Sequence, residues 1–462
     1  MKPKYFLALG LLVLGLGSCG ESFFEQYPSN NITEGNFYKT DDDFNQGVVA
    51  CYAKLKTQMS FHLTEIGYRG DENVLESMAV STQNRYDIDH FAETANNGIL
   101  NDIWNAWYNG IYRCNDVLDH MTGAKIANYD KYRGECLFLR SWWYFNLYRV
   151  FGVVPITRTV VTPAAAKLIP RCTEEEMYTL LTEDLAEAAR LLPPTPGPEK
   201  ARVANIAAYT LLAKVYLTFG KPGEAKTALE EAMKNTSYGL ESTTKKVFDV
   251  GNKMNREIIF ALYYNKTNDN GHGYWYSANT DVLADINNPT PTFKAIYDSE
   301  KDNRLPLISS YTKIKDNLFA MTKWYDTYDA TYTTQVGNDF PHLRYADVVL
   351  MYAEALAESG GSLGDALEWL NKTRTRAGLD ELTTDEVKSL AEFRRELAAE
   401  RGREFALEGH RWFDLVRLGL AVDYFREMGY SLDSHNLIFP IPQNQIEIVN
   451  NPSILWQNPG FN

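Results

Sequence analysis

The feature that most constrains the fold is a pair of adjacent helical segments with a fixed spacing of small and large apolar residues. Residues 204–219 and 222–234 each show a helical period, and Gly220 separates them. Six positions match the relative spacing of a tetratricopeptide repeat: Leu212, Ala213, Tyr216, Ala225, Leu229 and Ala232. Small residues let the two helices approach closely, and large ones fill the groove between them. Such a hairpin buries its apolar face only by stacking on neighbouring helices.

A second unit, with the same spacing within each of its two helices, occurs later in the chain. Its positions are Tyr352, Ala353, Leu356, Ala366, Leu370 and Thr373. The interval from Ala353 to Ala366 is one residue longer than that from Ala213 to Ala225, which predicts a longer turn. Further helices are expected at 41–59, 100–122, 129–151, 173–192 and 384–408. The fold class is therefore predicted to be mainly α, a scaffold of tetratricopeptide-type helical hairpins with a few short β-strands.

Two long stretches break the helical period. Residues 61–99 and 238–342 are polar with interspersed aromatic residues, and strands are expected within the second at 257–264 and 319–325. Irregular segments of this length in a compact body usually carry function. The helical scaffold then comprises about 41–60, 100–236 and 343–418, and we expect residues 19–462 to form one body.

Residues 1–18 predict an export signal. Lys2 and Lys4 precede an uncharged run over residues 5–17, which is too short to span a membrane. The run ends in Leu16-Gly17-Ser18-Cys19, which resembles the processing box of bacterial lipoproteins. That resemblance implies cleavage before Cys19 and acylation of this residue, so that lipid alone holds the protein to the membrane. The alternative is an ordinary secretory signal with an incidental cysteine.

Composition and missing motifs exclude several classes of protein. The formal net charge is −14 and the chain has no basic block, which argues against a nucleic-acid-binding protein. The chain has no P-loop, GxGxxG, HExxH or GxSxG motif, and its seven histidines are scattered. We therefore predict no catalytic residues, no metal site and no cofactor. With 60 acidic residues, the sequence by itself does not exclude a catalytic pair of carboxylates. The 29 tyrosines could form aromatic surfaces on which a ligand stacks, or they could pack at the edge of a helical core.

Four cysteines remain after processing: Cys51, Cys114, Cys136 and Cys172. No CxxC spacing occurs, which argues against a structural zinc site. Cys114 and Cys136 would lie level in an antiparallel hairpin of helices centred near residue 125. A disulfide between them is one possibility, and two buried free thiols are the alternative that we expect.

Seven stretches, in order along nearly the whole mature chain, closely resemble the SusD/RagB family of surface glycan-binding lipoproteins. They are FFEQYPSNNIT, WNAWYNGIYRCNDVLDHM, GECLFLRSWWYFNLYRVFGVVP, LRYADVVLMYAEAL, WLNKTRTRAGL, RRELAAERGREFALEGHRWFDLVR and IFPIPQNQIEIVNNPSILWQNPGF. The resemblance implies a mainly helical body on the outer membrane that binds a glycan without cleaving it. It also implies docking on a SusC-type TonB-dependent transporter. Because some members of the family bind peptides, peptide or glycopeptide capture is the alternative.

Most of these stretches are predicted to be scaffold. In ERGREFALEGHRWFDLVR, Glu400 and Glu404 are four residues apart on one helix face, and Arg411 and Arg417 follow a glycine that breaks the helix. This pattern predicts a charged helix end held by ion pairs. His410 lies in the same stretch, and we do not expect it to act as a catalytic base.

The resemblance also implies where a ligand binds. In the family, the loop before the WNAWYNGIYRCN helix and the middle irregular region form the ligand surface. In this chain they contain seven candidate ligand-binding residues: Arg85, Tyr86, Asn96, Asn97, Tyr274, Trp275 and Tyr276. Aromatic rings would stack on sugar faces, and polar side chains would bind hydroxyl groups. The alternative for Trp275 is a core position beneath its loop.

The lipid anchor is testable with one substitution. Replacing the proposed acylation site (Cys19→Ala) should release the protein from the membrane fraction, because no other segment is expected to hold it there. Detergent phase separation of the variant measures this. Complete retention of Cys19→Ala with the membranes would contradict the anchor.

The GHGYWYS loop at 271–277 yields a second prediction. Three consecutive aromatic residues on a glycine-flanked turn cannot all face a core, so Trp275→Ala should weaken ligand binding by about 1–3 kcal/mol. Its free energy of unfolding should change by less than about 1 kcal/mol. Calorimetric titration and a melting curve distinguish this from a core position, where the same change costs roughly 3–5 kcal/mol of stability.

Overall fold

The computed structural model describes residues 37–72, 83–197, 199–264, 277–279, 289–315, 318–324 and 337–461. Helices dominate these ranges, so the predicted mainly α fold is confirmed. None of the helices in the described ranges combines the length and the apolar character that a membrane span needs.

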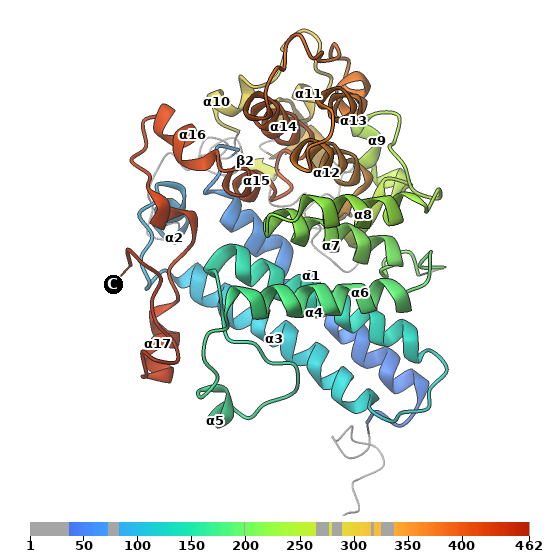
Figure 1. Cartoon of the computed structure of the whole chain (residues 1–462), viewed down its shortest axis with the longest axis vertical. Coiled ribbons are helices and arrows are strands. Elements are labelled where there is room, and N and C mark those ends of the chain that lie inside the picture. Colours follow the sequence, from blue (N-terminus) through green and yellow to red (C-terminus); the bar gives the residue numbers. More distant parts are fainter. Residues whose placement is uncertain are drawn as a thin grey trace, which may run out of the picture.

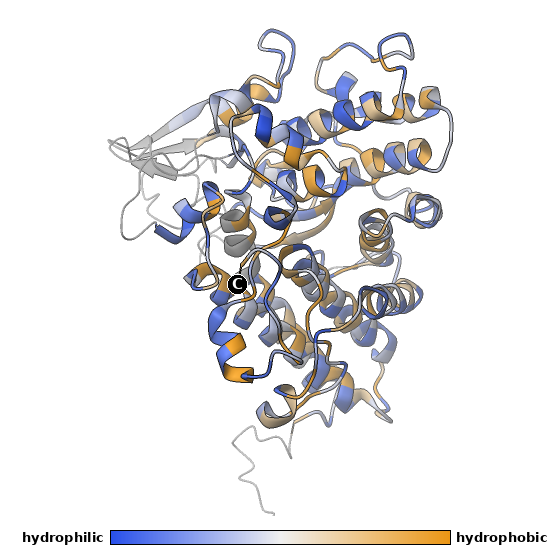
Figure 2. Ribbon diagram, turned by 60° about the vertical axis from the view of Figure 1, so that its left-hand side comes forward, coloured by the Kyte–Doolittle hydropathy of each residue, from blue (hydrophilic) through white to orange (hydrophobic). Residues whose placement is uncertain are grey.

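A continuous stack of helices forms the body (Figure 1). Its members are α3 (Gly98–Met121), α4 (Tyr129–Phe151), α6 (Glu174–Leu191), α7 (Asn205–Thr218), α8 (Pro222–Met233), α12 (Tyr345–Glu358), α13 (Leu363–Arg376) and α14 (Leu390–Glu404). Each helix packs against the next one named. Figure 2 shows apolar and hydrophilic residues interleaved along these helices, as expected where one face is buried and another is solvated.

The two predicted repeat units are α7–α8 and α12–α13. Residues 219–221 join the first pair and residues 359–362 join the second, so the predicted difference of one residue in turn length is confirmed. Both turns contain a glycine in the left-handed region, with φ of +67° at Gly220 and +82° at Gly360. A side chain is strained in that conformation, so glycine ends each first helix.

The start of the first irregular stretch was predicted incorrectly. Helix α1 (Asp41–Gly67) continues beyond residue 59 because its buried stripe continues. Leu63 and Ile66 are as buried as Leu55 and lie on the same face. A further short helix, α2 (Gln83–Asp89), also lies within the stretch expected to be irregular.

The C-terminal part is more helical, and differently divided, than predicted. Helix α14 begins at Leu390 rather than 384, because the Ser389 side chain accepts a hydrogen bond from Glu392 N and caps it. It ends at Glu404, ahead of left-handed backbone at Leu407 and Gly409. Three short helices follow: α15 (Arg411–Arg417), α16 (Ala421–Glu427) and α17 (Gln443–Val449). The remaining short helices are α5 (Pro163–Ala166), α9 (Thr244–Val247), α10 (Pro291–Lys294) and α11 (Leu305–Ser309), with 3-10 turns at Val250–Asn252, Thr322–Trp324 and Ser434–Leu437.

The strands form two small antiparallel sheets. Strand β1 (Ile258–Leu262) pairs with β5 (Phe340–Arg344). In the second sheet, β4 (Leu318–Met321) lies between β2 (Ser277–Asn279) and β3 (Tyr311–Lys315). The strands predicted at 257–264 and 319–325 correspond to β1 and β4, and the second is shorter than expected because Thr322 begins a 3-10 turn.

The four cysteines in the described part of the chain do not form disulfides. Cys51, Cys114, Cys136 and Cys172 are free and buried, which confirms the expected free thiols. They lie in the core that runs through the helical stack. Burial raises the pKa of Cys172 to about 11, so this thiol stays protonated and unreactive at neutral pH.

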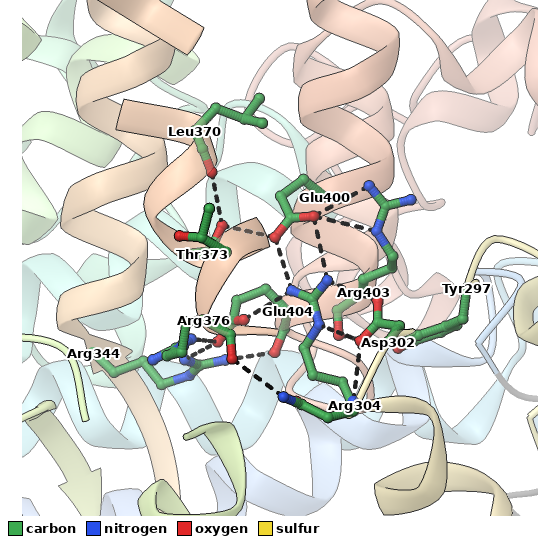
Figure 3. A network of polar contacts seen from close by, with 12 residues as sticks. Tyr297, Asp302, Arg304, Arg344, Leu370, Thr373, Arg376, Glu400, Arg403 and Glu404 are labelled. Carbon is green, nitrogen blue, oxygen red and sulfur yellow. Dashed lines mark hydrogen bonds and ion pairs between the residues drawn. The ribbon is translucent and has the colours of Figure 1, made fainter. Parts of the chain in front are cut away.

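A buried network of ion pairs joins the irregular region to the end of α14 (Figure 3). Arg344 contacts Glu257 at 2.7 Å, Glu404 at 2.6 Å and Glu408 at 2.8 Å. Arg304 contacts Glu400 at 2.8 Å and Glu404 at 3.0 Å. The predicted charged helix end is therefore confirmed, with partners from distant segments.

The network lowers the pKa of two of its carboxyl groups, those of Glu400 and Glu404, although both are buried. Burial by itself raises the pKa of Glu404, but the guanidinium groups of Arg376 and Arg344 outweigh it and hold the pKa well below its usual range. All these side chains are almost fully buried. Removing one cation therefore leaves a buried carboxylate without full compensation.

Replacing Arg344 with methionine (Arg344→Met) should lower the free energy of unfolding by roughly 3–5 kcal/mol, the usual cost of breaking a buried ion pair. Urea denaturation measures the change. Arg426→Met is the control, since its ion pair with Asp423 is exposed, and it should leave the midpoint nearly unchanged. Equal midpoints for both variants would contradict a structural role for the network.

Candidate functional site

The first predicted ligand loop lies at the start of α3. Arg85 and Tyr86 are on α2, and both are half-buried. The Tyr86 ring stacks on that of His90, with centroids 3.8 Å apart and planes at 16°. Asn96 is exposed in the loop between the two helices. The structure therefore brings Arg85, Tyr86 and Asn96 into one short segment, and their contact with a ligand stays a prediction.

Asn97 has a role within the fold. Its side-chain oxygen accepts a hydrogen bond from Ile99 N at 3.1 Å and caps α3. Its Nδ2 donates to the Asn84 carbonyl oxygen at 2.9 Å. With 3% of its surface exposed, Asn97 holds α2 and α3 together. Its predicted contact with a ligand is untested.

The remaining predicted site residues, Tyr274, Trp275 and Tyr276, lie outside the described residues, as does Cys19. Their predicted roles stay predictions. Strand β2 begins at Ser277, directly after the three aromatic residues, and pairs with β4.

A groove that was not predicted from the sequence runs along α3. Trp104, Tyr108 and Tyr112 line it at intervals of four residues, and its volume is about 370 Å³. The opposite walls are the loop between α4 and α6, which contains α5, and helix α17. These elements lie together in Figure 1. Tyr112 is 46% exposed, so one ring face is accessible at the groove.

Hydrogen bonds hold the walls of this α3 groove in place. The Tyr108 hydroxyl donates to the Pro155 carbonyl oxygen at 2.7 Å. Asn115 Nδ2 donates to the Thr157 carbonyl oxygen at 3.0 Å. Beneath them, Arg140 donates to Asn115 Oδ1 at 2.9 Å. A groove whose walls are fixed in this way loses little entropy on binding.

Helix α17 connects the α3 groove with the predicted loop. Gln445 Nε2 donates to Asn105 Oδ1 at 3.1 Å, at the groove. Two residues earlier, Gln443 N donates to the Ala95 carbonyl oxygen at 2.8 Å, next to Asn96. One short helix therefore borders both candidate surfaces.

The chemistry of the α3 groove is aromatic and mostly uncharged. Among its described lining residues, Lys167 alone carries a charge at neutral pH, while Asn105, Thr159 and Gln445 supply amides and a hydroxyl. Burial raises the pKa of Tyr108 well above its usual value, which keeps the phenol a neutral donor. Aromatic faces with neutral polar groups suit a ligand that has apolar C–H faces and many hydroxyl groups.

Exposed apolar side chains gather around the same groove. Seven large hydrophobic residues are exposed in the described part of the chain, and five of them line the groove or adjoin a lining residue: Tyr112, Val160, Leu168, Ile448 and Trp456. Such a concentration marks a binding surface.

A sequence signal for the groove existed. Trp104, Tyr108 and Tyr112 recur every four residues, so each lies about 40° further around α3 than the one before. The row therefore leads from the buried face at Trp104, which is 6% exposed, to the surface at Tyr112, which is 46% exposed. Aromatic residues that continue past the edge of the buried face indicate a second contact surface.

Two family models match the chain. Residues 302–461 match that of the SusD family, and residues 27–217 match one described as starch-binding associating with outer membrane. The chain belongs to the SusD family. SusD-like protein P2 of Formosa agariphila is 25% identical over 511 residues, which cover 99% of this chain and 100% of that protein.

Solved structures show the same fold. A laminarin binding SusD-like protein superimposes with a TM-score of 0.75 at 24% identity, covering 92% of this chain and 100% of that one. Surface glycan-binding protein A from Bacteroides thetaiotaomicron, in complex with laminarihexaose, gives a TM-score of 0.74 at 22% identity, covering 91% and 99%. The helical stack of this SusD-family chain is therefore the architecture of those proteins.

Proposed function

We propose that this protein captures a glycan at the outer-membrane surface and delivers it to a SusC-like TonB-dependent transporter, with its lipid anchor at Cys19. The α3 groove is the observation that carries the proposal, because its aromatic rings and neutral polar groups have the chemistry that sugars require. Relatives described as binding starch and laminarin, and one solved in complex with laminarihexaose, support the same ligand class.

Glycan capture needs few contacts. Each ring stacked on a sugar face contributes about 0.5–1.5 kcal/mol by analogy with aromatic pairs. A delivery protein must also release its cargo, for which a total of roughly −4 to −8 kcal/mol, millimolar to micromolar, is sufficient. Tyr112 together with two or three hydrogen bonds from the groove reaches this range.

We further propose that capture occurs without cleavage. Glycosidases need two carboxyl groups on either side of the scissile bond, and the described lining of the α3 groove contains no carboxylate. His410, the histidine of the most charged motif, is buried, and both burial and the nearby Lys214 lower its pKa. It is therefore a poor general base.

The function is tested by binding and turnover measured on the same samples. A glycan array with purified protein identifies ligands, and chromatography of the bound oligosaccharide after incubation should show no shorter products. Binding of peptides but not of glycans would favour the alternative of peptide capture. Product release that one carboxylate substitution abolishes would contradict the proposal of binding without catalysis.

The role of the α3 groove is tested with Tyr112→Ala. This change should weaken binding of laminarihexaose, or of the best glycan from the array, by about 1–3 kcal/mol in calorimetry because it removes a stacking face. Tyr263→Ala is a matched control, since Tyr263 is 45% exposed and does not line the groove. Unchanged affinity in Tyr112→Ala would move the glycan site to the loop that contains Tyr86 and Asn96.

A further inference from the structure

A second cavity, of about 340 Å³, has a different chemistry from that of the α3 groove. It lies between the last turn of α4, the end of α7, helix α15 and residues 437–438. Arg149, Lys214, His410 and Arg417 contribute polar lining, and apolar side chains such as Phe413 and Ile438 complete it. At about 30 Å³ per water molecule it has room for roughly ten waters, or for one monosaccharide.

The charges around this cavity do not balance. Four cations and three carboxylates pack together: Arg149, Lys214, Arg401 and Arg417 with Asp347, Glu354 and Asp414. Three of the cations are paired. Lys214 contacts Asp347, Arg401 lies 2.8 Å from Asp414, and Arg417 contacts Glu354 and lies 2.9 Å from Asp414.

Arg149 is the unpaired cation. No described carboxylate lies within 4 Å of its guanidinium, which sits between the rings of Phe145 and Phe413 at 4.6 Å and 3.9 Å from their centroids. Its Nη2 donates to Asn146 Oδ1, whereas the buried Nε has no acceptor. The carbonyl groups at the end of α4 offset part of the charge.

The cationic state persists at neutral pH. Burial lowers the pKa of Arg149 to about 9 and that of Lys214 to about 8, and both values remain above 7. Asp414 also lines the cavity, but Arg401 and Arg417 hold its two oxygens. An incoming anion therefore meets a net positive charge.

We propose that this cavity binds the carboxylate of a small acidic sugar, of hexuronate size, at the Arg149 guanidinium. A guanidinium pairs with a carboxylate through two parallel hydrogen bonds, and the Nε of Arg149 has no acceptor in the protein. The apolar wall of Phe413, Val416 and Ile438 suits the C–H face of a sugar ring. This site is separate from the α3 groove and does not depend on the proposed function.

D-glucuronate, D-glucose and acetate are the probes, added to the purified protein during thermal unfolding and calorimetry. Glucuronate should raise the melting temperature in a concentration-dependent manner, while glucose and acetate should not. No shift with glucuronate, or an equal shift with glucose, would overturn the proposal. A full shift with acetate would overturn the assignment to a sugar acid.

Arg149→Met tests whether Arg149 binds the carboxylate, because this change removes the charge but keeps an apolar side chain between the two phenylalanine rings. Glucuronate affinity should fall roughly tenfold to a hundredfold, as expected for a lost charged hydrogen bond. Arg149→Lys should retain part of the binding, and Arg158→Met, at an arginine exposed by 44%, should retain all of it.

The unliganded variant supplies an independent measurement. Because Arg149→Met removes an unpaired charge, its melting temperature without ligand should equal or exceed that of the wild type. A much lower melting temperature would show that Arg149 is needed for the fold itself and would overturn its assignment as an unpaired ligand-binding cation. Undiminished glucuronate binding in Arg149→Met would also overturn the assignment of Arg149 as the ligand-binding cation.

Discussion

The ion pairs between arginines and the buried carboxylates of Glu400 and Glu404 are the interaction on which the C-terminal half depends. Arg304, Arg344 and Arg376 reach these carboxylates from an irregular segment, a strand and a repeat helix (Figure 3). An isolated buried charge costs several kcal/mol. If one of these segments detached, it would leave a buried carboxylate without its arginine, so the segments stay together. The network thus specifies how the irregular region packs on the helical stack.

Similar pairing operates elsewhere at long range. Arg411 on α15 contacts Asp71, just after α1, at 2.8 Å, and Arg140 on α4 binds Asp184 on α6 at 2.8 Å. The second pair lies beneath Asn115 and so supports the floor of the α3 groove. The scaffold therefore supports the groove with charged contacts, while the surface offered to a ligand is almost uncharged.

The two cavities divide the molecule into regions of distinct chemistry. The α3 groove presents aromatic faces and amides, and stacking contacts of modest strength would suit the proposed delivery of a ligand. The cavity beside Arg149 presents an unpaired cation in a partly enclosed space, where electrostatic attraction is stronger than at the surface. The proposed glycan site and the proposed sugar-acid site therefore lie on separate surfaces with different chemistry.

The sequence by itself determined the local features. The spacing of small and large residues specified both helical hairpins, including the longer second turn, and α4 has the predicted bounds, Tyr129–Phe151. The charged end of α14 was also predictable from Glu400 and Glu404. These features depend on periodicity and on residues close in the chain, which local propensity and burial dictate.

Tertiary structure decided which distant residues meet. The walls of the α3 groove come from α3, the loop before α6 and α17, and the last of these lies more than 300 residues further along the chain. Likewise, Arg149 became an unpaired cation only because the carboxylates of α12 and α15 bind other cations, among them Lys214 on α7 and Arg401 on α14. Charge balance and cavity shape depend on three-dimensional packing, which local sequence patterns do not encode.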